Sequence, residues 1–296
     1  MGKFEATRKT EEIVLPSGIK ARLRSLMGEH QVLISQSDEK KRRNAIDEML
    51  LDCIASLGEK SSLTMQDIEK LFSADRAYAL FRIRQLSNKT SDKFVFDYEF
   101  PVDANGSRRK QRYIVEFNKK DFPARPYFWV WEKMKADYKA ANKLERDLTE
   151  EQEEEILEKT DFPEMFTSYE DIREKYFEQI CTLPESGVAV HWYILDGESE
   201  KKFAANKKAK DVNSHDQIVL RKPVYEEEDY KPGAVMPNVP LNKLSLEDIE
   251  ALREDIMKKE ANIETSVVIQ YREDAGVQTS LNLITVPAFF FPSLAK

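Results

Sequence analysis

The sequence predicts an α+β fold, and three patterns carry that prediction. The residues on either side of Pro16-Ser17-Gly18 alternate as in a β-hairpin, Glu39 to Leu57 follows a helical period, and Phe94 to Phe117 alternates again. We therefore expect an N-terminal β-hairpin with helices and antiparallel strands. A charged helical insertion and a C-terminal helix with a second β-hairpin should follow.

The N-terminal elements are predicted in a definite order. The first ordered segment is Glu12 to Ser35, and it contains a hairpin that turns at Pro-Ser-Gly. A helix over 39–57 follows, with Gly58 as its stop signal, and a second helix starts after Thr64, where Asp67 resembles a capping-box partner. A third helix covers about Ser73 to Leu86, with one face made of Ala77, Leu80, Phe81 and Arg84.

The clearest hairpin comes next. Phe94 to Phe100 alternates aromatic residues with Val, Asp and Glu, and Asp103-Ala104-Asn105-Gly106 is a strong turn signal. Alternation resumes at Tyr113, Val115 and Phe117. Two antiparallel strands should therefore flank this turn.

The middle of the chain is charged. Pro126 to Lys159 reads as helical, and its run Glu150 to Glu155 is either a solvated face or a fraying junction. A helix over Tyr169 to Ile180, capped by Ser168, should precede a strand over Val188 to Leu195. Four prolines and a glycine make 223–240 a linker candidate.

The C-terminal segment predicts a capped helix and two strands. Ser245 should cap a helix whose buried face includes Ile249, Leu252, Ile256 and Ile263. Thr265–Tyr271 and Gln278–Val286 then alternate as strands. We accordingly divide the chain into a first domain (1–122), a charged, largely helical insertion with linker (123–240), and a C-terminal helix–hairpin unit (241–296).

Composition restricts the function classes. The 296 residues carry a net charge of −8, which disfavours bulk attraction to nucleic acid. The polar start lacks an apolar leader and no apolar run spans a membrane, so we expect a soluble protein in a cytoplasm unless it leaves with a larger particle. Cys53 and Cys181 are interpreted as reduced thiols, because one candidate pair does not make a disulfide framework.

Patterns for catalysis or cofactor binding are missing from the sequence. His30, His191 and His215 have no metal-ligand spacing, and no nucleotide-binding glycine motif occurs. The run Ser214-His215-Asp216 does not make a catalytic triad, because triad residues come from separate elements. We therefore predict no enzyme activity, no cofactor and no metal.

Two features are candidates for protein contacts. The hairpin tip over 107–112 is basic through Arg108, Arg109 and Arg112. Such a tip beside aromatic residues can also bind single-stranded nucleic acid, which we keep as the alternative function. The terminal aromatics Phe289, Phe290 and Phe291 should be buried, either in this chain's own core, which we favour, or in a partner.

Several short motifs stand out over about Val14 to Phe117 and Leu244 to Ser293. The motifs are, in order, Ile13-Val14-Leu15-Pro16-Ser17-Gly18 with Arg22-Leu23-Arg24, Leu50-Leu51-x-Cys53-Ile54, Asp75-Arg76 with Leu80-Phe81-x-Ile83-Arg84, Asp248-Ile249-x-Ala251-Leu252-Arg253, and Pro287 to Pro292. Together they resemble the T4-type bacteriophage baseplate hub assembly family.

The resemblance implies a protein that helps to build the tail baseplate hub of a contractile-tailed phage, or becomes part of it. It implies contacts with other tail or baseplate proteins, location in the host cytoplasm during assembly or in the virion tail, and no catalysis. Family members often carry paired cysteines in the second hairpin, where a structural zinc would bind. This chain has Pro101, Val102 and Asp103 there instead, so it should form the hairpin without metal.

Overall fold

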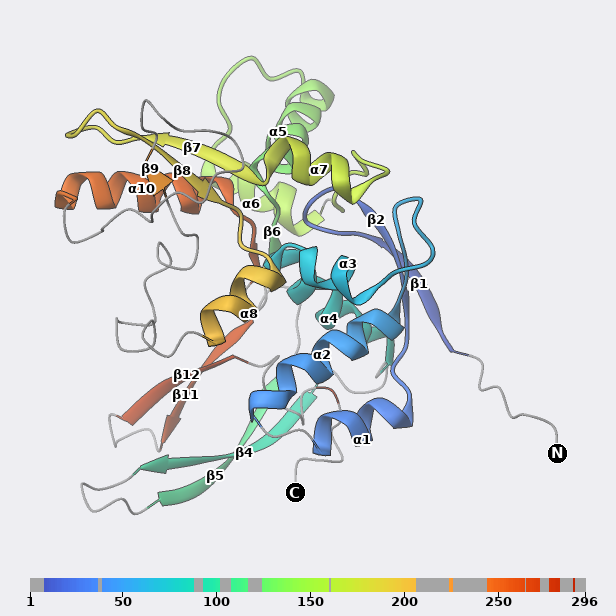
Figure 1. The fold of residues 1–296 in the computed structure, drawn as a ribbon. Coiled ribbons are helices and arrows are strands. Elements are labelled where there is room, and N and C mark those ends of the chain that lie inside the picture. The colour runs from blue at the N-terminus through green and yellow to red at the C-terminus, as the bar shows by residue number, and fades with distance from the viewer. Residues whose placement is uncertain are drawn as a thin grey trace.

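The computed structural model describes residues 8–36, 39–87, 93–101, 108–116, 124–159, 161–205, 224–225, 244–263, 265–271, 277–282 and Phe290. Within these residues the chain has the predicted α+β fold, with helices packed beside small antiparallel sheets (Figure 1).

The N-terminal sheet contains β1 (Thr10–Val14), β2 (Lys20–Arg24) and β3 (Ile54–Leu57), in that order. The predicted Pro-Ser-Gly hairpin is confirmed: β1 and β2 pair from Val14 opposite Lys20 to Thr10 opposite Arg24. The helix predicted through Leu57 is wrong beyond Cys53. Ile54 and Leu57 also suit a strand, and pairing with the buried side of β2 at Ala21 and Leu23 determines their conformation.

Four helices follow or flank this sheet: α1 (Gly28–Gln36), α2 (Glu39–Cys53), α3 (Met65–Lys70) and α4 (Ser73–Ser87). The capping box predicted at Thr64 and Asp67 is present at the start of α3. The predicted face of α4, Arg84 included, is buried, and burial extends around the helix to Asp75 and Arg76. α4 is therefore a central helix whose polar residues need internal partners.

Two β-ribbons extend in the same direction from the lower part of the molecule (Figure 1). β4 (Lys93–Pro101) pairs with β5 (Arg108–Glu116), which confirms the second predicted hairpin. β11 (Ser266–Tyr271) pairs with β12 (Val277–Asn282), as expected for the C-terminal strands. Each ribbon has one face that contributes to the core, through Phe96 and Ile269 respectively.

The middle of the chain alternates helices and short strands. In order they are β6 (Ala124–Arg125), α5 (Phe128–Asn142), α6 (Glu150–Lys159), α7 (Tyr169–Tyr176), β7 (Glu178–Thr182), β8 (Ala189–Tyr193), α8 (Gly197–Ala205) and β9 (Val224–Tyr225). The helix predicted through Ile180 is wrong from Glu178 onward, where pairing with β8 draws the chain into a sheet ordered β7-β8-β9. Ser168 precedes α7 but its hydroxyl makes no capping bond.

The C-terminal helix α10 (Leu246–Lys259) starts as predicted, with the Ser245 hydroxyl accepting from the Asp248 N–H at 3.1 Å. Ile263 was expected on this helix but lies in β10 (Asn262–Ile263), which pairs with β6. The predicted linker over 223–240 lies outside the described residues apart from β9, as does the part of the last predicted strand beyond Asn282.

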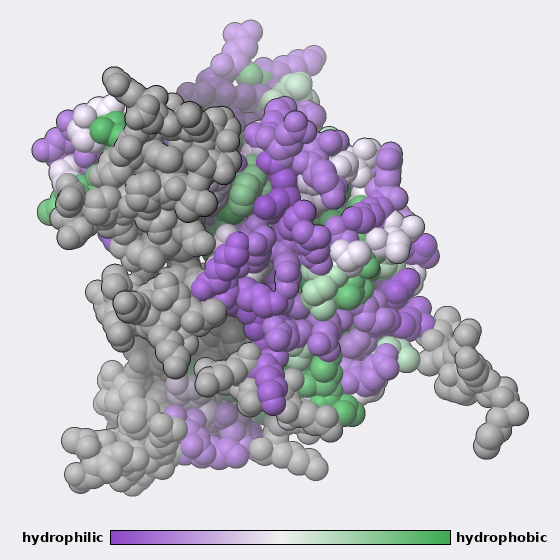
Figure 2. All heavy atoms as spheres, viewed as in Figure 1, coloured by the Kyte–Doolittle hydropathy of each residue, from purple (hydrophilic) through white to green (hydrophobic). Residues whose placement is uncertain are grey.

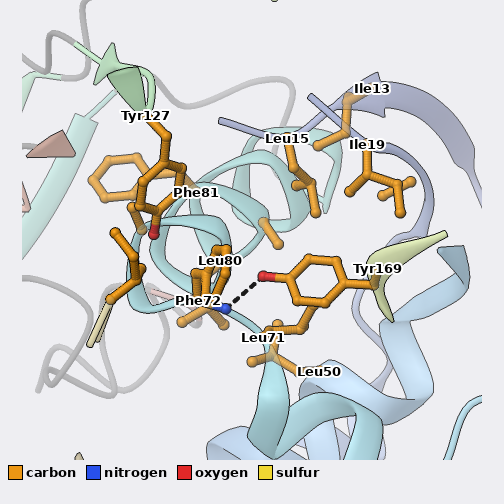
Figure 3. Close-up of a cluster of buried hydrophobic side chains, with 14 of the residues drawn as sticks. Ile13, Leu15, Ile19, Leu50, Leu71, Phe72, Leu80, Phe81, Tyr127 and Tyr169 are labelled. Carbon is orange, nitrogen blue, oxygen red and sulfur yellow. Dashed lines mark hydrogen bonds between the residues drawn. The ribbon is translucent and has the colours of Figure 1, made fainter. Parts of the chain in front are cut away.

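The core is centred on aromatic residues distant in sequence. The Phe72 ring lies 5.3 Å from the rings of both Tyr127 and Tyr169, measured between centroids. Figure 3 shows these side chains closing around Phe72 and α4. One hydrophobic cluster runs from Ile13 to Phe290 and takes residues from all three predicted units.

Candidate functional site

A buried polar network connects the Pro-Ser-Gly turn to the helices. The Ser17 N–H donates to an Asp75 carboxylate oxygen at 3.0 Å, and the Tyr169 hydroxyl donates to the other at 2.8 Å. The Tyr169 oxygen also accepts from the Phe72 N–H at 2.6 Å, the bond drawn in Figure 3. The Trp129 indole donates to the Ser17 carbonyl at 2.9 Å. The turn, α4, α5 and α7 therefore meet through hydrogen bonds.

Asp75 is the ionisable centre of this network. Its side chain is fully buried, and the loss of solvation raises its pKa from 3.8 to about 7, although the contacts with Ser17 and Tyr169 favour the charged form. Burial also raises the pKa of Tyr169 well above its usual 10. Tyr169 is therefore protonated near neutral pH and does not act as a general base there. The geometry indicates that Asp75 and Tyr169 hold the Pro-Ser-Gly turn, α4 and α7 together.

Two arginines, one buried and one half-buried, contact both a carboxylate and the end of α3. Arg76 pairs with Asp47 of α2 and donates to the Ile68 carbonyl at 2.8 Å. Arg173 lies 2.9 Å from Asp196 and donates to the Lys70 carbonyl at 2.7 Å. Both guanidinium groups thus donate to carbonyls in the last turn of a short helix, where few intrahelical donors remain. These two hydrogen bonds attach the end of α3 to α4 and α7.

The described residues contain a histidine–carboxylate–thiol cluster that the sequence analysis missed. Side-chain atoms of His30, Asp52 and Cys53 lie within 4.8 Å of one another. The Arg8 guanidinium lies among them, 2.5 Å from the Asp52 carboxylate and 3.2 Å from the Cys53 sulfur. His30 is 22 residues from Asp52, so only the approach of α1 to α2 could reveal the cluster.

The donor set of this cluster does not fit a metal ion. The His30 Nδ1 accepts from the Met27 N–H at 2.8 Å, so a neutral ring carries its proton on Nε2, which faces Asp52 at 3.0 Å. Burial raises the pKa of Cys53 to about 12 and lowers that of His30. The Cys53 thiol is neutral, the His30 nitrogen that faces Asp52 carries a proton, and the Arg8 guanidinium occupies the position that a cation would need. These three residues therefore do not provide a set of metal ligands.

Two open clefts accompany these clusters. One of about 500 Å³ lies between the turn after β3, α3 and the start of α7, and one of about 420 Å³ lies beside β3. Two cationic side chains that line the larger cleft already form ion pairs. Lys60 pairs with Asp67 at 2.7 Å, and Arg173 pairs with Asp196. In the larger cleft one hydroxyl meets a carboxylate: Ser168 donates to Glu170 at 3.2 Å, an exposed contact at the start of α7.

The predicted contact residues fall in different surroundings. The hairpin tip predicted over 107–112 is wrong from Arg108 onward, because these residues pair with β4 as part of β5. Arg112 is exposed on that strand, and the side chains of Arg108 and Arg109 lie outside the described part. Phe290 is 1% exposed and belongs to the chain's own core, so it does not offer a surface for a partner in this conformation. Phe289 and Phe291 lie outside the described residues.

The outer face of the β4–β5 ribbon combines charged residues with two apolar ones, Ile114 and its partner Val95, of which Val95 is half-buried. Asp97 on β4 lies 3.0 Å from both Arg112 and Lys110 on β5, and these contacts, Arg112 foremost, lower the pKa of its carboxyl. Ile114 follows on the same face and is 63% exposed. The opposite face carries Phe96, which is 2% exposed. The ribbon therefore presents a polar face with one exposed apolar residue.

Among the described residues, the exposed face shown in Figure 2 is mostly hydrophilic, with small separate hydrophobic patches. No helix in that part of the chain combines the length and hydrophobicity that crossing a membrane would need. Comparison of the chain with protein families, with curated proteins and with solved structures finds no match.

Proposed function

We propose that this chain is a non-enzymatic phage tail baseplate component or hub assembly factor that acts through protein–protein contacts. The observation that carries the contact part of the proposal is the β4–β5 ribbon, which extends from the body and exposes Ile114 beside the Lys110–Asp97–Arg112 cluster (Figure 1). An apolar anchor with a charged surround is the usual composition of a protein-contact surface. The baseplate part rests on the motif resemblance.

The internal geometry agrees with a structural use of the resembling motifs. Asp75 and Arg76 of α4 bind the Pro-Ser-Gly turn, Tyr169, Asp47 and the end of α3. The bonds to Ser17, Tyr169 and Asp47 join elements far apart in the sequence, whereas the bond to Ile68 joins α4 to the helix before it. If the motif residues stabilise the fold in this way, partner proteins would be bound by exposed residues such as Ile114.

The proposal is tested by disrupting the gene for this chain in the phage genome. We expect lysates with heads but without assembled tails by negative-stain electron microscopy, and rescue by the wild-type chain. Ile114→Lys should fail to rescue, because it replaces the apolar anchor with a hydrated charge. Leu246→Lys is the matched control: Leu246 is 79% exposed on α10, and this variant should rescue.

Both variants should keep the wild-type thermal midpoint, since each substitution lies on the surface. Normal tails in the disrupted phage, or full rescue by a folded Ile114→Lys chain, would contradict the proposal. Mass spectrometry of purified virions separates a permanent component from a transient assembly factor.

The alternative is a nucleic-acid-binding or packaging-associated phage protein. Lys110 and Arg112 are the exposed cations on the described outer face of β5, and both already contact Asp97, which offsets their charge. The alternative predicts retention on DNA or RNA that falls steeply with salt. A gel shift at low salt that is lost in Lys110→Gln/Arg112→Gln would favour it over the baseplate proposal.

A further inference from the structure

Strand β7 lies at the edge of the β7-β8-β9 sheet. The backbone hydrogen bonds just beyond each end of the β7–β8 pair show which residues of β7 bond to β8. The Leu183 N–H donates to the Val188 carbonyl at 2.8 Å, and the Ile194 N–H donates to the Phe177 carbonyl at 2.9 Å. In an antiparallel pair every second residue bonds to the partner strand. Gln179 and Cys181 therefore bond to β8, and the residues between them point their backbone groups outward.

One observed contact supports this assignment. The Ile180 carbonyl accepts a hydrogen bond from the Lys259 ammonium of α10 at 3.2 Å, which requires that this carbonyl point away from β8. The Ile180 N–H points the same way, as do the backbone groups of Glu178 and Thr182. Among the described residues, the N–H groups of Ile180 and Thr182 have no hydrogen-bond partner.

The side chains of β7 divide between the two faces of the sheet. Gln179 and Cys181 are buried, on the face that holds Trp192, whose indole donates to Asp255 of α10. Ile180 points to the other face and is 53% exposed, with exposed Glu178 and Thr182 on either side. An accessible edge with a half-exposed β-branched residue at its centre can accept another extended strand.

We propose that β7 pairs antiparallel with β7 of a second copy of this chain, about a two-fold axis at Ile180. In this register Ile180 lies opposite Ile180 of the second copy, and their N–H and C=O groups exchange two hydrogen bonds. Glu178 lies opposite Thr182 of the second copy, so no like charges face each other. The two sheets become one, and the interface is isologous, which closes the assembly at a dimer.

Lys259 regulates access to this edge. A lysine at a sheet edge is a common protection against pairing. Its ammonium also lies 2.9 Å from Asp255, so it can leave the Ile180 carbonyl without losing its ionic partner. In the paired register, Glu178 of the second copy lies about two residues, roughly 7 Å along the strand, from that carbonyl. The displaced ammonium therefore has acidic groups on both chains.

Cysteine cross-linking tests the register directly. In the Ile180→Cys variant the two introduced thiols lie on opposite residues with Cα atoms about 5.5 Å apart, within disulfide reach. Thr182→Cys is the matched control, since its two copies lie about 13 Å apart in the same register. Under mild oxidation we expect a disulfide-linked dimer from Ile180→Cys and several-fold less from Thr182→Cys. The wild type is the blank, because Cys53 and Cys181 are buried.

Sedimentation equilibrium measures the association itself. We expect the wild type to form a dimer, Ile180→Lys to weaken it at least ten-fold by placing two ammonium groups opposite each other, and Lys259→Met to strengthen it several-fold. Val268→Lys, at a 70% exposed position of β11, should leave it unchanged.

The proposal is overturned if the wild type and Lys259→Met are both monomeric at the highest soluble concentration. Equal cross-linking at positions 180 and 182 would also overturn it, as would open-ended oligomers in place of a dimer. None of these results bears on tail assembly, so this test and that of the proposed function fail independently.

Discussion

Asp75 combines full burial with a position between three elements. Its carboxylate accepts hydrogen bonds from Ser17 and Tyr169, and Figure 3 places Tyr169 against Phe72 at the start of α4. Burial raises the pKa of Asp75 to about 7, so the folded chain binds a proton there more tightly than the unfolded chain does between pH 4 and pH 7.

This linkage predicts a pH dependence of stability. The contribution of Asp75 to the free energy of unfolding should be fully present below pH 4, fall as pH rises, and level off above pH 7. The total change is on the order of 4 kcal/mol, from about three pKa units. Asp75→Asn cannot titrate and should lack this component. Urea unfolding of both chains from pH 4 to pH 8 measures it as a difference, and parallel profiles would contradict the assignment.

At the scale of elements, close approach of two backbones places the turn after β3 against the start of α7. Gly58 has a φ of 57°, and a Cβ atom at this position would meet the Thr167 carbonyl oxygen at 1.9 Å. The Glu59 N–H donates to the same carbonyl at 2.9 Å. Only glycine combines this positive φ with this approach.

Gly58→Ala should therefore lower the free energy of unfolding by roughly 3 kcal/mol or more, through backbone strain and displacement of the segment before α7. Gly187→Ala is a matched control: Gly187 has a φ of 69° but nothing within 4 Å of its added Cβ. It should lose only about 1 kcal/mol, the cost of the conformation. Urea titrations of the two variants compare them, and equal losses would mean that the contact at Thr167 is unimportant.

For the whole molecule, one hydrophobic cluster connects the first strand to Phe290, six residues before Lys296. It includes Leu252 and Ile256 of α10, Ile269 of β11 and Phe290, together with the aromatic residues around Phe72. The C-terminal elements therefore contribute to the same core as the N-terminal sheet, and their loss should affect the stability of the whole chain.

Phe290→Ala should lower the free energy of unfolding by about 3–5 kcal/mol, because a large side chain that is 1% exposed leaves a cavity. Leu246→Ala removes an apolar side chain that is 79% exposed and should change stability by less than about 0.5 kcal/mol. Thermal unfolding followed by circular dichroism distinguishes the two. An unchanged midpoint for Phe290→Ala would show that Phe290 does not pack in the core in solution.

Local patterns in the sequence were sufficient for much of the fold. The alternation on both sides of Pro16-Ser17-Gly18, the capping residues Thr64 and Ser245, and the period of α4 each specify their own element, because the signal lies within a few neighbouring residues. The same patterns located the β4–β5 ribbon, but they assigned 107–112 to its tip, whereas Arg108 to Arg112 are paired residues of β5. They could not show that Ile114, one of several apolar residues in β5, would be the exposed one.

Tertiary structure decided the rest. Ile54 to Leu57 and Glu178 to Thr182 suit either a helix or a strand, and only the presence of β2 and β8 beside them selects the strand. The partners of Asp75, the approach of His30 to Cys53 and the edge position of β7 join residues from distant parts of the chain. The sequence determined the local elements, since their signals are short-range, and packing determined which polar groups are buried and which strand edge stays accessible.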